Sequence, residues 1–238
     1  MRYLHPVTVH EQYVASGTYS LRTDAAAGPV LVEEWSIHQQ PDGAHFVRVD
    51  REDPAKHAVW LAEGWRSPAG DGGQLERYDI LAYRTDQQPV MRLRASYSLF
   101  PDLVEVGRTI GDSPREYVEL TPTNYVFDPG SFVFWGAVAS DMLCGDREHV
   151  IGICDDSSSP DVLLPHTRAM SAVLVGEDRV ELGGREHEAR IVELRRQGVP
   201  DIQRLWIDAN DVVLRAETHR EGRVVAHIAL SNYGRRAY

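Results

Sequence analysis

Polar and apolar residues alternate with a period of two along most of the chain. Short runs rich in Val, Ile, Tyr and Trp are separated by turn sequences such as Pro-Asp-Gly at 41–43 and Asn-Asp at 210–211. This pattern is typical of β-strands joined by tight turns. Since no strand is followed by a long helical pattern, we predict hairpin connections and an antiparallel sheet. The predicted strands lie near 15–23, 29–39, 44–50, 57–63, 75–84, 89–99, 103–110, 115–120, 150–154, 168–176, 179–183, 187–196, 202–208, 212–219 and 223–231.

One segment in the middle of the chain departs from this period. From Phe132 to Met142, apolar residues recur at spacings of three and four, which indicates an amphipathic helix. Ser131 is a suitable N-cap, and Gly145 stands where the end of a helix favours a positive φ. The sequence therefore predicts a mainly β protein with a central helix laid on its sheet.

Turn chemistry also predicts the register of individual hairpins. A three-residue loop at 41–43 places His38 opposite Phe46, and a two-residue turn at 210–211 places Trp206 across from Arg215 in a cation–π pair. Together with a three-residue loop at 220–222, this register gives the last three strands one continuous apolar face. Its members are Leu205, Ile207, Val212, Leu214, Ala216, Val224, Ala226, Ile228 and Leu230. Such a face needs a cover, and we expect the helix to supply it.

Composition narrows the possible partners. The 238 residues contain 25 Lys and Arg against 36 Asp and Glu, a net charge of −11. This balance disfavours nucleic acid and anionic lipid surfaces, both of which attract positive proteins. The single lysine, Lys56, is not in a phosphate-binding Gly-Lys-Ser/Thr motif. No apolar stretch approaches the roughly 20 residues of a membrane span.

Length and cysteine content bear on organisation and location. We expect one domain over 1–238, with 155–161 as the place where an internal division would fall. Two cysteines and the lack of a signal sequence favour the cytoplasm. A periplasmic or secreted location would follow if a signal had been removed.

The C-terminal strands resemble a known family. Leu205-Trp206-Ile207-Asp208 is followed by Arg215-Ala216-Glu217, by a Gly222-Arg223-Val224 turn and by Ser231-Asn232-Tyr233. This order is similar to the closing strands of the LolA/LolB-like lipoprotein-carrier superfamily. The DUF3108 group is similar too, and has a counterpart of Gly184 to Leu194 just upstream. The resemblance covers about 50 of the 238 residues. It implies an antiparallel half-barrel wrapped around helices, with a hydrophobic cavity between them.

Sequence motifs for catalysis or metal binding are weak. Asp141, Cys144, His149 and Cys154 follow a zinc-like spacing, but the surrounding residues predict a buried helix end and a buried strand. We therefore expect no metal, and cysteines that are either buried or joined in a disulfide. No nucleophile elbow or zinc-protease motif is present, so no catalytic residues and no cofactor are predicted.

Aromatic residues gather in the first 135 positions and suggest a binding cavity under a curved sheet. The candidate ligand-binding residues are Trp35, Phe132, Trp135, Met142 and Ala226. They could equally fill a solid core. We expect a non-catalytic carrier of an apolar or lipid-like molecule. The alternatives are an enzyme using the same cavity and a scaffold that pairs with a partner protein through a sheet edge.

Overall fold

The computed structural model describes residues 1–26, 28–68, 73–86, 88, 90–145 and 149–236. Within them the chain forms fifteen strands, one α-helix and one short 3-10 helix, η1 (Pro54–Lys56). The first eight strands are β1 (Gln12–Thr23), β2 (Leu31–Gln39), β3 (His45–Asp53), β4 (Ala58–Arg66), β5 (Leu75–Arg84), β6 (Met91–Phe100), β7 (Leu103–Ile110) and β8 (Glu116–Leu120). They are followed by β9 (Tyr125–Asp128), α1 (Phe132–Cys144), β10 (His149–Ile153), β11 (Pro165–Leu182), β12 (Arg185–Arg196), β13 (Ile202–Ile207), β14 (Val213–Arg220) and β15 (Arg223–Arg235).

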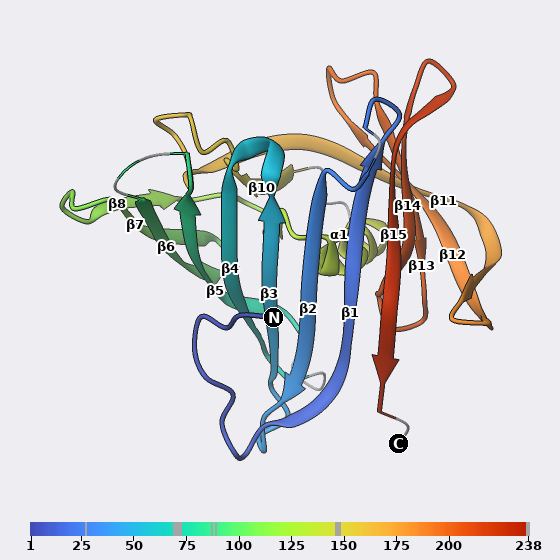
Figure 1. Cartoon of the computed structure of the whole chain (residues 1–238), viewed down its shortest axis with the longest axis horizontal. Helices are drawn as coiled ribbons and strands as arrows, with labels where there is room; N and C mark the ends of the chain where they lie inside the picture. The colour runs from blue at the N-terminus through green and yellow to red at the C-terminus, as the bar shows by residue number, and fades with distance from the viewer. Residues whose placement is uncertain (27, 69–72, 87, 89, 146–148, 237–238) are drawn as a thin grey trace.

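All fifteen strands belong to one curved, unclosed sheet (Figure 1). Its order is β8-β7-β6-β5-β4-β3-β2-β1-β15-β14-β13-β12-β11-β10-β9. Strands β1 to β8 and strands β10 to β15 each lie next to their neighbours in the chain, and the first and last strands of the chain pair at the centre, with Tyr19 opposite Leu230. The mainly β, antiparallel fold predicted from the period of two is confirmed.

The three-residue loop at 41–43 forms as predicted, and His38 lies opposite Phe46. Trp206 also lies opposite Arg215, but the predicted two-residue turn at 210–211 is wrong. The Asp208 amide donates to the Val212 carbonyl across a three-residue loop, and a bulge between Trp206 and Ile207 restores the predicted pair. The Arg215 guanidinium carbon is 4.6 Å from the centre of the Trp206 ring, so the predicted cation–π pair is confirmed.

The prediction of a three-residue loop at 220–222 is wrong. Arg220 pairs with Arg223 across a two-residue turn, in which Glu221 and Gly222 both have positive φ. A bulge then restores the alternation of faces, so that Ala226 lies opposite Thr218.

One parallel pair interrupts the antiparallel sheet. β9 was not predicted, and it pairs in parallel with β10, with Val126 opposite Val150. Two parallel strands require a crossover, and α1 provides it. β11 is likewise one long strand, although two strands at 168–176 and 179–183 were expected.

The ends of α1 differ partly from expectation. Ser131 occupies the N-cap position, but its side chain makes no capping hydrogen bond. The Val133 amide instead donates to Oε1 of Glu33 on β2, over 3.1 Å. Gly145 is extended, with φ −144° rather than the predicted positive value.

The helix lies inside the curve of the sheet and forms the centre of the core (Figure 1). The Phe132 ring packs edge-on against Tyr19 of β1, and Phe134 packs edge-on against Tyr78 of β5. Gly136 lets the backbone of the β13–β14 turn approach the helix at Asp211. In the described part of the chain, no helix has the length and hydropathy needed to cross a membrane.

Candidate ligand-binding cavity

The predicted ligand-binding residues fall into two environments. Trp35, Phe132 and Met142 are buried in the core, with 1%, 5% and 5% of their surface exposed. Trp135 on α1 and Ala226 on β15 are half-buried. The first group therefore supports the fold, while Trp135 has a side accessible from outside.

A series of aromatic ring contacts, one stacked and two edge-on, joins three of these residues. Trp35 stacks on Tyr19 with ring centres 5.9 Å apart, Tyr19 meets Phe132 at 6.0 Å, and Phe132 meets Trp135 at 5.0 Å. The series runs from the sheet to Trp135 on the helix. It ends at a cavity beside the Trp135 indole.

The cavity has a volume of about 180 Å³ and lies between α1 and strands β11 to β14. Its apolar wall consists of Trp135, Val138, Met170, Leu194 and Val199. Its polar wall consists of Asp128, Arg168, Arg196, Asp201, Gln203 and Thr218. Neither Met142 nor Ala226 lines it, but Thr218 is the strand partner of Ala226. The meeting of helix and sheet was predictable, whereas the contribution of β11 was not.

Charges on the polar wall are only partly paired. Arg168 contacts Asp128 at 3.6 Å, and burial raises the pKa of Asp128 although Arg168 and the Gly130 amide oppose that rise. Asp201 is bound by Arg220 through two 2.7 Å hydrogen bonds. Among the described residues, Arg196 has no carboxylate partner at salt-bridge distance. The cavity therefore combines an apolar wall with a guanidinium, that of Arg196, for which the described part of the chain supplies no carboxylate partner.

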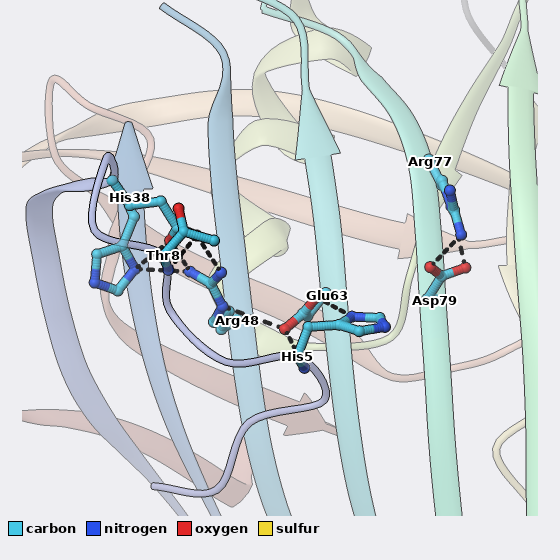
Figure 2. A network of polar contacts seen from close by, with 8 residues as sticks. His5, Thr8, His38, Arg48, Glu63, Arg77 and Asp79 are labelled. Atoms are coloured by element: carbon cyan, nitrogen blue, oxygen red, sulfur yellow. Dashed lines mark hydrogen bonds and ion pairs between the residues drawn. The ribbon is translucent and has the colours of Figure 1, made fainter. Parts of the chain in front are cut away.

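A second polar cluster lies on the opposite face of the sheet, under the N-terminal segment 1–11 (Figure 2). Arg48 is 2% exposed and contacts Glu11 at 2.6 Å and Glu63 at 3.2 Å. Glu63 also accepts a hydrogen bond from the His5 amide and lies 2.8 Å from the His5 ring. These contacts hold the N-terminal segment against β3 and β4.

Ionisation in this cluster follows from its burial. Burial opposes ionisation of Glu11, but hydrogen bonds from Arg48 and Thr8 outweigh it and lower the pKa of that carboxyl. Burial, followed by the Arg48 charge, lowers the pKa of His38. The predicted register placed His38 opposite Phe46, and therefore on the same face as Arg48, which is two residues after Phe46. The segment 1–11 that covers this face has no strand or helix pattern, so its position over the sheet could not be predicted from the sequence.

An enzyme that used a histidine and a carboxylate for general acid–base catalysis would need both groups in the cavity. The histidine–carboxylate contacts in the described structure, such as His5 with Glu63 and His219 with Glu217, involve residues that do not line it. Histidine is also absent from the residues lining the cavity. Among the described residues that line the cavity, there is therefore no histidine–carboxylate pair.

The zinc-like motif does not form a cluster. Cys144 is exposed at the end of α1, Cys154 is half-buried after β10, and both are free thiols. In the part of the chain that the structure describes, no three His, Cys, Asp or Glu side chains lie close enough to share a metal ion. Neither of the two expected alternatives holds, because no disulfide joins the cysteines and Cys144 is exposed rather than buried.

Comparison with known proteins identified no family for this chain. No protein-family model matches the chain, and no curated protein matches it at a significant level.

Proposed function

We propose that this protein binds a small molecule with an apolar body in the cavity beside Trp135, without chemically changing it. The observation that carries the proposal is the cavity itself, which lies where the apolar stripe of α1 meets strands β11 to β14. The resemblance to lipoprotein carriers supports it, because the resembling strands β12 to β15 supply Leu194, Gln203 and Thr218 to the wall.

The size of the cavity limits the ligand. An apolar cavity of about 150 Å³ in another protein accommodates benzene, so 180 Å³ suits one aromatic ring or a short acyl chain. A longer chain would have to extend past Val199, which is 39% exposed.

The polar wall favours an acidic group on that ligand. Arg196 has no described carboxylate partner, and a guanidinium binds a carboxylate through charge-assisted hydrogen bonds. An apolar body against Trp135 and Leu194, with a carboxylate at Arg196, satisfies both walls. We therefore expect short-chain or single-ring carboxylates to bind more tightly than the matching alcohols.

Titration of the protein with hexanoate, phenylacetate and 1-hexanol, followed by NMR, tests this proposal. Thr218→Trp should fill the cavity and abolish binding of all three, while Thr167→Trp, an exposed change on β11, should leave binding intact. Arg196→Gln should weaken carboxylate binding about tenfold and spare the alcohol, because it removes a charged hydrogen bond.

Two results would contradict the proposal. The first is no saturable binding of any of the three probes to the wild type. The second is binding that Thr218→Trp leaves unchanged, which would place the ligand elsewhere. A negative heat-capacity change with little salt dependence for the alcohol is the expected signature of apolar burial.

A further inference from the structure

Strand β11 has an open edge over most of its length. β10 pairs only with Pro165–Ala169, while β12 pairs along the other side from Met170 to Leu182. Beyond Ala169, no described strand lies against the free side of β11. Its unpaired amides and carbonyls can therefore accept another strand.

The middle of this edge is apolar and exposed. Val173, Leu174 and Val175 have 48%, 55% and 47% of their surface exposed. Since neighbouring residues of a strand point to opposite faces, Val173 and Leu174 expose apolar surface on both sides of the sheet. No proline or lysine protects Met170–Gly176.

The outer edge at β8 is different. It has only five residues, and two of them, Glu116 and Glu119, are exposed carboxylates. Short length and charge are the usual protections of a sheet edge. Over Met170–Gly176, the β11 edge lacks both of the protections that β8 has.

We propose that a second copy of this chain pairs with this edge, antiparallel and related by a two-fold axis at Leu174. The charge pattern selects this occupant. Glu177 and Asp178 form an acidic end of the exposed part of β11. Arg168 lies at the other end of this part, beside Arg196, which is on β12 opposite Met170. An antiparallel pair brings the acidic end of each copy to the basic end of the other. A parallel pair would bring like charges together.

The two-fold axis defines a register. Leu174 faces its own counterpart, Val173 faces Val175, and Met170 faces Asp178. No like charges are opposed over Met170–Asp178. The bulge at Val175 falls near the axis, where it increases the twist that two-stranded ribbons favour. Arg168 and Arg196 also line the cavity, but the pairing itself requires no bound ligand.

Sedimentation velocity of the full chain over a range of concentrations tests the association. The weight-average mass should rise from 26.8 kDa toward twice that value and no further, because a two-fold interface closes on itself. Leu174→Lys, at an exposed position, should weaken dimerisation at least about tenfold. Tyr117→Lys on β8, where Tyr117 is 73% exposed, should not.

Disulfide trapping tests the register in a Cys144→Ser background. Leu174→Cys should form a covalent dimer, because facing residues of antiparallel strands have Cα atoms about 4.5–5.5 Å apart, within disulfide range. Ser171→Cys, predicted to face Glu177, should not. A monomer at all concentrations, a dimer that Leu174→Lys leaves intact, or equal trapping at both positions would each overturn the proposal.

Discussion

Glu33 shows how one residue links the sheet to the helix. Its carboxyl is completely buried, accepts the Val133 amide at the start of α1, and has Oε2 without a hydrogen-bond partner. Burial raises the pKa of Glu33 from 4.5 to about 7, although Arg51 and the helix amides favour the ionised form. The desolvation cost is therefore larger than the attraction of the helix N-terminus.

The pKa of Glu33 predicts a loss of stability as pH rises from about 4.5 to 7. In this window the folded state binds more protons than the unfolded state, so the free energy of unfolding falls, by about 3 kcal/mol at about 1.4 kcal/mol per pKa unit. Glu33→Gln keeps the acceptor for Val133 but cannot ionise. It should remove this part of the pH dependence and be more stable than the wild type above pH 7.

Urea unfolding of both proteins from pH 4 to 8 provides the measurement. The difference between the two curves isolates Glu33 from other titrating groups. A constant difference across this range would show that Glu33 has an ordinary pKa. Glu33→Leu, which also cannot ionise but loses the acceptor for Val133, should be less stable than Glu33→Gln at every pH and serves as the control for helix capping.

At the scale of elements, α1 and the β13–β14 turn fit closely at one point. A Cβ atom added to Gly136 would lie only 1.9 Å from the Asp211 carbonyl oxygen. Ser140, one turn later, donates to the Gly136 carbonyl at 2.7 Å and is 2.6 Å from the Asp211 carboxylate. The turn is therefore bound to the helix by both backbone proximity and side chains.

Gly136→Ala should destabilise the protein although alanine favours helices. The helix gains about 1 kcal/mol from its propensity, but the clash with backbone forces α1 away from the turn at a greater cost, of order 3 kcal/mol or more. Gly28→Ala, with open space around its Cβ, is the matched control. Thermal unfolding measures both. A Gly136→Ala protein as stable as the wild type would show that the turn moves freely.

The features that could be predicted from the sequence are those determined by residues close together in the chain. The pair His38–Phe46 follows from the turn residues between its strands, and the helix from Phe132 to Met142 follows from its own periodicity. The pair Trp206–Arg215 was predicted through a two-residue turn that does not form, and a bulge next to Trp206 restores it. β9 was missed because four residues are too few to show a period. The candidate residue Trp135 was found from the helix stripe. Its neighbours Met170 and Leu194 come from strands whose approach depends on the curvature of the whole sheet.

At the scale of the whole molecule, contacts across the chain join the two halves of the sheet. β1 and β15 pair at the centre, from Ala15 with Arg235 to Thr23 with Ala226. The segment 155–161, where a division would fall, is bound instead to the first half. Arg84 donates to the Ser157 carbonyl at 2.9 Å, and Arg108 donates to the Pro160 and Val162 carbonyls at 2.8 Å.

We therefore predict a single cooperative unfolding transition for residues 1–238. The core is continuous, and each half would expose the face that packs on α1 if the other unfolded. Two variants that retain one tryptophan each, Trp60 on β4 or Trp206 on β13, provide a fluorescence probe for each half. Their urea transitions should coincide with each other and with the loss of far-ultraviolet circular dichroism, after correction for the stability of each variant. If Trp60 and Trp206 instead reported separate midpoints, and a fragment ending near 155–161 retained the Trp60 transition, the chain would consist of two domains. The Arg108 contacts would then be an interface between them.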